Sequence, residues 1–217
     1  TNPYSDYSYV FLTVDLGEGK RIENAEKVSE TPDVVVNSFL DYQIVEDDAY
    51  NLNNMGATWY GDKFDASLSR KYSFNFPNLI KEKKCNLFSE VASRNYSRSD
   101  FIYKANGSQI YKLASTTNVY DGLYASMLKT GNIKFNSDKD QIVIDLTYSR
   151  TTSNSTGWLD YISINAWREL KFTGKMMPFR NPDCFSGEKV YRYEIANANA
   201  NMQVWDVTNP TEPKNVN

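Results

Sequence analysis

The residue types that usually carry out hydrolytic chemistry are scarce in this chain. It contains no His and only two cysteines, Cys85 and Cys184. Because a Cys or Ser nucleophile usually takes its activation from a His base beside it, neither a Cys–His nor a Ser–His pair can be assembled from these residues. Zinc sites that use His are excluded for the same reason, and two distant cysteines do not form a Cys-only site. The sequence therefore predicts a chain without catalytic residues of its own.

The two cysteines lie in unlike surroundings. Cys85 opens an apparent strand after the run Lys81-Glu82-Lys83-Lys84, whereas Cys184 lies in the loop Asn181-Pro182-Asp183-Cys184. A disulfide between them is one alternative in an oxidising compartment. We expect two free, partly buried thiols instead.

Carboxylates are the other groups that could do chemistry, and the densest acidic run is Glu46-Asp47-Asp48. Its oxygens could ligate calcium, or supply the acid and nucleophile of a glycosidase-like pair. The spacing fits no calcium-binding loop, so we expect a solvated turn, with a structural calcium site as the alternative. We predict no other cofactor.

A set of aromatic residues with polar neighbours suggests binding rather than catalysis. This aromatic set comprises Trp59, Tyr60, Trp158, Asp160, Tyr161, Trp167 and Arg168. Flat rings left in water beside hydrogen-bonding groups could stack on sugar rings, as they do in carbohydrate-binding jelly rolls. The other interpretation is that the rings close the core or meet a neighbouring domain or partner, and we favour it because aromatic residues in strands usually pack.

The end of the chain combines a short aromatic strand with prolines. Val204-Trp205-Asp206-Val207 predicts a strand, and Asn209-Pro210-Thr211-Glu212-Pro213 follows it directly. Each Pro removes a backbone donor and biases the preceding residue away from helix, so this stretch is typical of a domain exit. We therefore predict one β-domain over residues 1–208 and an exit over 209–217 into a downstream domain. Trp205, with Asp206 and Asn209, is the candidate docking element for that domain.

The elements that must position these residues are predicted to be strands. Tyr72, Phe74 and Phe76 alternate with polar residues, which is the period of a strand with one buried face. Helical patterns are short and weak. The predicted strands lie within 7–15, 33–45, 72–76, 101–104, 109–113, 132–135, 142–148, 157–165, 191–195 and 203–207. Many short strands separated by turn residues predict an all-β sandwich or jelly roll resembling a carbohydrate-binding module, with few or no long helices.

Composition agrees with a single globular β-domain. The chain has 217 residues, of which 14% are aromatic, and 217 residues suffice for one sizeable core. Its net charge is −3, with Lys and Arg scattered among acids, so we predict no nucleic-acid partner. No apolar run approaches the roughly 20 residues that span a bilayer, so no transmembrane segment is predicted.

Several local patterns, taken in order, resemble one protein family. Residues 9–15 (YVFLTVD) lead into Gly17-Glu18-Gly19-Lys20-Arg21-Ile22, and Trp59-Tyr60-Gly61-Asp62 follows. Later come 157–170 (GWLDYISINAWREL) and 204–210 (VWDVTNP). Together these resemble the non-catalytic, β-rich region that precedes the peptidase domain in PorU-like type IX secretion sortases of Bacteroidota, which are relatives of the gingipain cysteine peptidases.

The resemblance implies a secreted protein at the cell surface or outer membrane. The peptidase domain of such a sortase removes C-terminal sorting signals from secreted cargo and helps to attach the cargo to lipopolysaccharide. Its catalytic Cys and His belong to that domain, which would follow Asn217, so no catalytic residue is carried over to this chain. The implied partners are the peptidase domain in cis, other secretion-system proteins and cargo. The alternative from the residues alone is a carbohydrate-binding module or adhesin domain with a glycan partner.

Overall fold

The computed structural model describes most of the chain. The described residues are 7, 9–12, 14, 16–52, 58–116, 126–174, 176–185 and 189–216. Ten strands form the main body: β3 (Ser38–Glu46), β4 (Lys63–Phe64), β5 (Ser69–Asn75), β6 (Cys85–Arg94), β7 (Ser99–Ala105), β8 (Ser108–Ser115), β9 (Ser126–Lys129), β10 (Ile133–Phe135), β11 (Gln141–Arg150) and β12 (Thr156–Glu169). Outside it lie β1 (Glu23–Asn24), β2 (Val34–Val36), the 3₁₀ helix η1 (Pro182–Cys184), β13 (Tyr191–Tyr193), β14 (Trp205–Asp206) and β15 (Lys214–Asn215).

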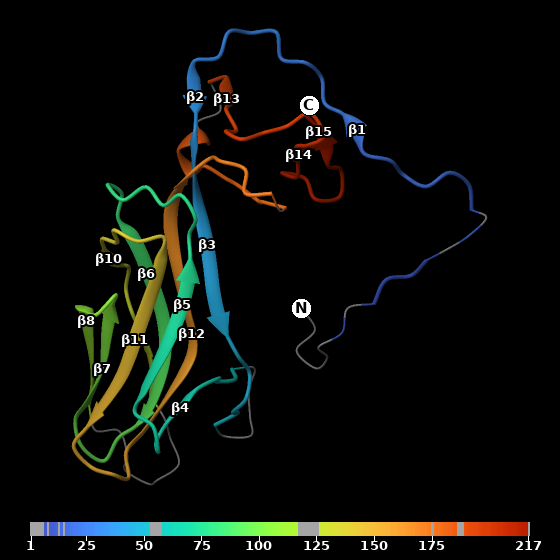
Figure 1. Ribbon diagram of the computed structural model, residues 1–217. Coiled ribbons are helices and arrows are strands. Elements are labelled where there is room, and N and C mark those ends of the chain that lie inside the picture. Colours follow the sequence, from blue (N-terminus) through green and yellow to red (C-terminus); the bar gives the residue numbers. More distant parts are fainter. Residues whose placement is uncertain are drawn as a thin grey trace.

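The ten strands form two antiparallel sheets that pack face to face (Figure 1). One sheet has the order β10-β6-β12-β3, with β4 paired to β12 and β9 paired to β6. The other has the order β5-β11-β7-β8. Inward-facing side chains of both sheets belong to one hydrophobic core. The predicted all-β sandwich is therefore confirmed, and the described residues contain no α-helix.

Alternation along the strands explains the core. In β11, Ile142, Ile144, Leu146 and Tyr148 are fully buried, and the residues between them are not. Because successive side chains of a strand point to opposite faces, this pattern gives the sheet one buried side. Strands β6 and β12 of the opposing sheet contribute apolar side chains to the same core.

Strand β12 crosses the whole sandwich and contains one irregularity. Leu159 pairs with Val91 and Tyr161 pairs with Glu90, so Asp160 is the extra residue of a β-bulge. Such a bulge shifts the alternation by one residue. Leu159 before it and Ile162 after it both reach the core, while Trp158 packs in a separate cluster.

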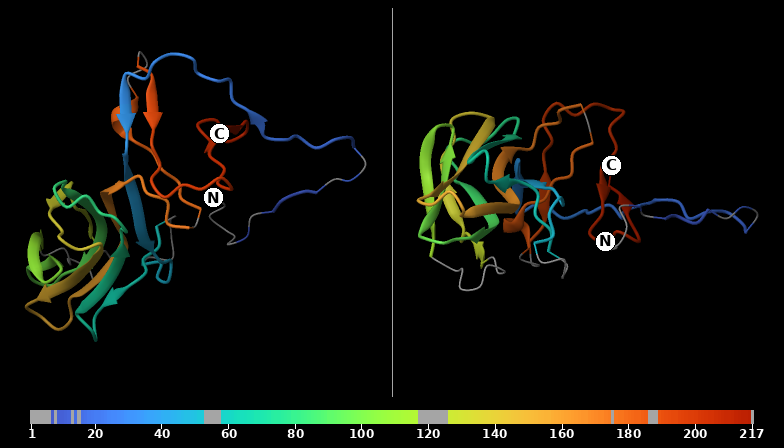
Figure 2. Two further views of the ribbon diagram at one scale, coloured as in Figure 1. Left: turned by 45° about the horizontal axis from the view of Figure 1, so that its top comes forward. Right: turned by 90° about the horizontal axis from the view of Figure 1, so that it is seen from below.

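Two small sheets lie beyond the sandwich. Strand β2 runs on towards β3 and pairs in parallel with β13, next to η1. Strand β1 pairs in parallel with β15, which also pairs with β14, so segments from opposite ends of the chain meet. Figures 1 and 2 show this second sheet, which we call the terminal sheet, to one side of β2 and β13.

Most of the predicted strands are confirmed, and one is wrong. The described residues of the run 7–15, which are 7, 9–12 and 14, belong to no strand and are all exposed. β-propensity measures how well a side chain fits a pleated, half-buried surface, and no neighbouring strand of the described chain provides that surface here. The predicted exit over 209–217 contains β15, so part of it pairs with β1.

The cysteines are both free, as expected. Cys85 is buried in the core at the start of β6, and Cys184 is half-buried at the end of η1.

Candidate functional site

The first half of the aromatic set lies on the outer side of β12, and two of its rings are covered. Trp158 and Tyr60 are 7% and 3% exposed and pack on Ala92. The segment before β4 holds them, because Tyr60 exchanges backbone hydrogen bonds with Tyr50 and Gly61 N–H donates to Leu159. Trp59 points away and is 41% exposed. This end of the sheet thus offers one open indole rather than a row of rings.

Carboxylates surround the covered Tyr60 hydroxyl. Burial, together with the negative charges of Asp160 and Glu90, raises the pKa of Tyr60 to about 12. Glu90 is itself buried, and Asp160 is the half-buried bulge residue of β12. The phenol is therefore neutral at physiological pH.

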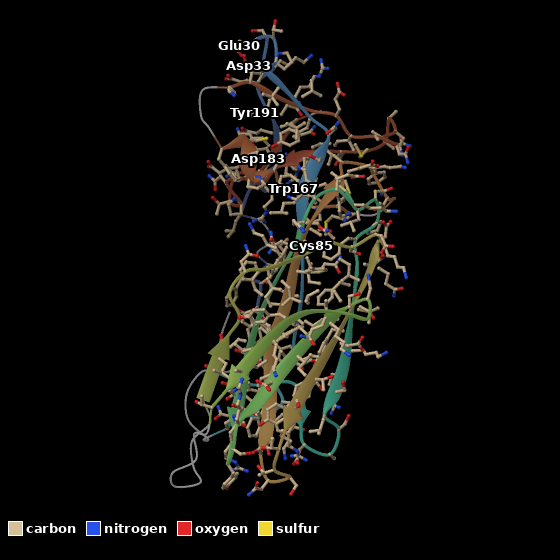
Figure 3. The ribbon with its side chains drawn as sticks, turned by 90° about the vertical axis from the view of Figure 1, so that its left-hand side faces the viewer. Glu30, Asp33, Cys85, Trp167, Asp183 and Tyr191 are labelled. Atoms are coloured by element: carbon tan, nitrogen blue, oxygen red, sulfur yellow. The ribbon has the colours of Figure 1, made fainter. Side chains whose placement is uncertain are left out.

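The second half of the set lies at the far end of β12, roughly 30 Å away at 3.3 Å per residue. Trp167 is half-buried and carries the Lys83 ammonium 3.6 Å from its ring centroid. Figure 3 places Trp167 above Cys85 and below Asp183, where the sandwich meets the small β2–β13 sheet. The aromatic set is thus split into two sites that one small ligand cannot bridge.

The contacts of Arg168 connect elements of the fold. Its Nη1 donates to Asp41 Oδ2 at 2.7 Å, and its Nε donates to the carbonyl oxygen of Pro77 at 2.7 Å. The guanidinium also lies over the Phe39 ring, 5.0 Å from the centroid. These contacts tie β12 to β3 and to the turn after β5, and the side chain is only 8% exposed.

The candidate docking residues lie in the terminal sheet. Trp205 is 50% exposed in β14, opposite Asn215. Asp206 accepts the backbone N–H of Thr208, and the hydrogen bonds from Thr208 lower the pKa of its carboxyl. Asn209 Oδ1 accepts both the N–H and the hydroxyl of Thr211. Asp206 and Asn209 therefore shape the turn, and Trp205 is left as the contact residue.

The acidic run occupies the end of β3. Glu46, Asp47 and Asp48 are all exposed, and Glu46 pairs across the sheet with Tyr161. No group of three or more metal-ligating side chains occurs in the described part of the chain. Calcium binding by these residues stays a prediction.

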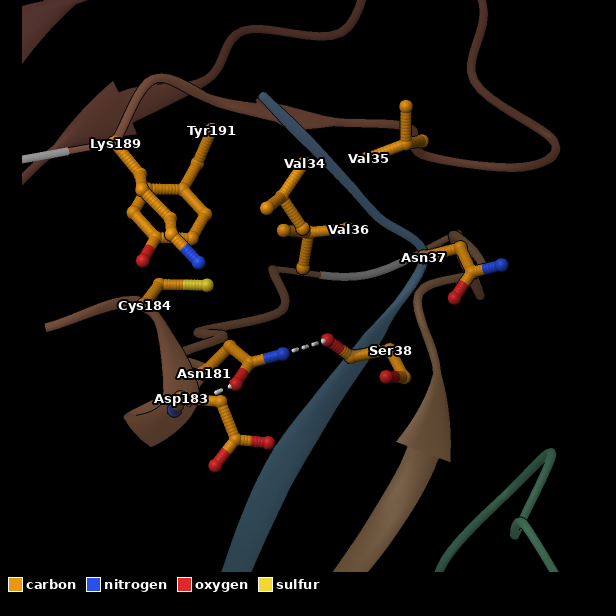
Figure 4. A pocket seen from close by; sticks show the side chains of 10 residues that line it. All are labelled: Val34, Val35, Val36, Asn37, Ser38, Asn181, Asp183, Cys184, Lys189 and Tyr191. Carbon is orange, nitrogen blue, oxygen red and sulfur yellow. Dashed lines mark hydrogen bonds between the residues drawn. The ribbon is translucent and has the colours of Figure 1, made fainter. Parts of the chain in front are cut away.

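A pocket that the sequence did not indicate opens between β2, η1 and β13. Its volume is about 220 Å³, and Cys184, Lys189 and Tyr191 point into it from one side (Figure 4). Asn181 fixes its floor by donating to the Ser38 carbonyl and accepting the N–H of Asp183. From the sequence we identified the loop 181–184 but predicted no pocket there, because β2 and β13 are distant in sequence. The pocket gathers a thiol, an ammonium group and a phenol, but the chain has no imidazole to activate the thiol.

A larger, shallow cavity of about 570 Å³ lies at the end of the sandwich, beside the turn between β7 and β8. Its polar lining includes Lys134, Lys139, Asp138 and Gln109. Asn106, which also lines it, adopts a left-handed conformation (φ 48°) at the turn and accepts the N–H of Val143.

A second feature that the sequence did not indicate is the bare apolar segment before β1. Val10, Phe11 and Leu12 are 92%, 95% and 89% exposed. The sequence pattern predicted a strand here, whereas the described residues of the segment belong to no strand. Within the described residues no helix is both long enough and apolar enough to cross a bilayer.

A solved structure resembles this chain in fold over most of its length. No protein-family model and no curated protein matches this sequence. The crystal structure of dimeric latent PorU from Porphyromonas gingivalis matches 91% of this chain with a TM-score of 0.73 and 17% identity. That match covers 19% of the PorU chain, so this chain spans about a fifth of its length. The fold expected from the family resemblance is therefore confirmed.

Other solved structures match only partly. A family 35 carbohydrate-binding module from an environmental isolate covers 66% of this chain, with a TM-score of 0.38 and 16% identity, and aligns over 95% of its own length. The module CBM36, solved with calcium and xylotriose, covers 56% of this chain, with a TM-score of 0.36 and 19% identity, and aligns over 98% of its own length. These scores are too low to support an inference.

Proposed function

We propose that this chain is a non-catalytic accessory domain of a gingipain-like type IX secretion sortase and precedes its peptidase domain. The observation that supports this most is the PorU-like fold over 91% of the chain, at a TM-score of 0.73. The absence of His fits, since the neighbouring peptidase domain would supply the catalytic Cys and His. In this proposal the parent protein is secreted, acts at the cell surface or outer membrane, and processes C-terminal sorting signals of secreted cargo.

The domain would act by binding and positioning. Its sandwich is a rigid body, and the exposed Trp205 of the terminal sheet would contact the peptidase domain in cis. Tryptophan is frequent among the residues that dominate interfaces, because its large ring buries much area with few rotamers to fix. Other secretion-system proteins or cargo would use further surfaces of the sandwich.

Replacing the docking residue tests this role. In the full-length protein Trp205→Ala should weaken the contact with the peptidase domain by about 2 kcal/mol or more. Differential scanning calorimetry should then show the peptidase transition at a lower temperature. Trp59→Ala, which removes an exposed indole outside the terminal sheet, is the matched control. An equal response to both changes, or no response to either, argues against docking through Trp205.

An activity measurement tests whether cleavage requires the peptidase domain. The 217-residue chain alone should not cleave a sorting-signal peptide, whereas the full-length protein should, in a thiol-dependent way. Thiol-dependent cleavage by the isolated chain would contradict the proposal. The gene should also continue beyond Asn217 into a Cys–His peptidase domain.

Glycan binding remains the alternative function and can be tested directly. The open Trp59 indole is the feature that favours it, although Tyr60 and Trp158 are covered. If the domain is a carbohydrate-binding module, a glycan array should give a signal that Trp59→Ala removes without changing the circular dichroism spectrum. No signal on the array would count against this alternative.

A further inference from the structure

The segment that precedes β1 is a strand sequence without a sheet. Its described large side chains are all at least 74% exposed. They are Tyr7, Tyr9, Val10, Phe11, Leu12, Val14 and Leu16. Figures 1 and 2 show the segment running away from the sandwich in every view. A folded protein rarely leaves such a contiguous apolar surface in water unless it is an interaction site.

The pattern of the segment indicates what kind of sheet it fits. Tyr9 and Phe11 lie on one face of an extended chain, and Val10 and Leu12 lie on the other. Strands that are apolar on both faces belong to sheets covered on both sides, whereas a half-exposed strand alternates with polar residues. The segment therefore has the composition of a strand buried on both faces.

The terminal sheet, whose strand β1 follows this segment in the chain, also lacks a core of its own. Its three strands have two residues each, and no described residue of 16–35 or 199–216 is buried. Small sheets need a hydrophobic face packed against something to be stable. Trp205, Val207 and Val216, in or next to strands of this sheet, are exposed as well.

Both ends of the described chain converge at this place. Strand β1 follows the segment and is held beside β15 by parallel pairing and by the ion pair of Lys214 with Glu23 at 2.9 Å. A domain joined after β15 would therefore be tethered beside β1, the strand that follows the bare segment in the chain. Tethering by a short linker gives an effective concentration in the millimolar range, well above that of a second copy at ordinary protein concentrations.

We propose that residues 9–12 add as a β-strand to the open edge of a sheet, covered on both faces, in the peptidase domain of the same polypeptide. This inference rests on the proposed function, which supplies that domain. Backbone hydrogen bonds to the edge strand give the affinity of such an addition, and the side-chain pockets on both faces give its specificity. The domain and the peptidase would thus be joined by a shared sheet as well as by the Trp205 contact.

Hydrogen exchange in the full-length protein tests the strand addition. The amides of residues 10–12 should exchange at least about 100-fold more slowly there than in the isolated 217-residue chain, because an added strand is protected by its backbone hydrogen bonds. Phe11→Asp should restore fast exchange. Met176→Asp is the matched control, since Met176 is 98% exposed outside the segment, and it should leave the protection unchanged.

The remaining outcomes separate this inference from the proposed function. Fast exchange in the full-length protein overturns the strand addition. Protection that survives removal of the peptidase domain means a different acceptor and also overturns it, while the proposed accessory role stands. Protection that appears only at concentrations where light scattering reports a dimer would assign the segment to a second copy instead. A full-length sequence without a peptidase domain contradicts the proposed function itself, before any exchange is measured.

Discussion

Single side chains connect neighbouring strands and turns of the sandwich, and Arg168 is the clearest example. Arg168→Ala removes the donors to Asp41 and Pro77 in a mostly buried place. We expect a loss of about 3 kcal/mol in the free energy of unfolding, because a buried charge left without its partner is costly. Urea denaturation measures it. Lys71→Ala, which breaks an exposed pair with Asp145, should cost less than about 1 kcal/mol. Equal costs would contradict this account.

The two thiols should differ in reactivity. Burial raises the pKa of Cys85 to about 11, whereas Cys184 is half-buried and faces the small pocket. Because the thiolate is the reactive form, a thiol reagent at pH 8 should label one cysteine of the native protein quickly and the second only after denaturation. Cys184→Ser should abolish the fast phase, and Cys85→Ser should keep it. Two fast phases would show that Cys85 is accessible.

Stability should fall at alkaline pH because of buried phenols. Burial raises the pKa of Tyr60 to about 12 in the folded chain, against an ordinary value of 10.0. The folded state then keeps a proton that the unfolded chain releases, so the stabilisation is complete below about pH 10 and is lost as the pH rises towards 12. Tyr60→Phe should flatten the decline of the urea midpoint between pH 9 and 11. An unchanged slope would assign the decline to other groups.

At the scale of the elements, a glycine in β12 allows this strand to pack closely against the opposing sheet. A Cβ on Gly157 would lie 2.9 Å from Phe101 Cζ and 3.0 Å from Tyr148 Cγ, inside the core. Gly157→Ala should therefore cost about 2 kcal/mol, since overfilling a packed core displaces its rings. Gly131→Ala is the control, because its Cβ would meet nothing within 4 Å. Thermal denaturation compares the two, and similar midpoints would mean that the rings move aside easily.

The alternation of apolar residues was enough to predict β5 and β11, because burial of one sheet face leaves a direct imprint on every second residue. The bulge at Asp160 was not predictable from that pattern. It depends on the pairing of β12 with β6, which is a contact between segments far apart in sequence. The pocket at Cys184 was not predictable from the sequence for the same reason, since β2 and β13 meet only in the folded chain.

At the scale of the whole molecule, the bare segment should control solubility. A neutral, β-prone, apolar run such as 9–14 is an aggregation hazard when it is exposed. The isolated chain should self-associate, and removal of residues 1–16 should reduce its light scattering while the sandwich stays folded, because none of the described residues of this stretch belongs to the core. Phe11→Asp should give a smaller effect in the same direction. Unfolding of the sandwich on removal of residues 1–16 would contradict this assignment.

The sequence by itself determined the lack of an imidazole, predicted the fold class and most strands of the two sheets, and favoured free thiols over a disulfide. These follow from composition and local periodicity, which a single chain displays directly. Only the tertiary structure decided which aromatic rings are covered, that Arg168 is a buried clamp, that residues 9–12 are exposed, and that the terminal sheet has no buried residues. Burial depends on which distant segments meet, and no local pattern records that.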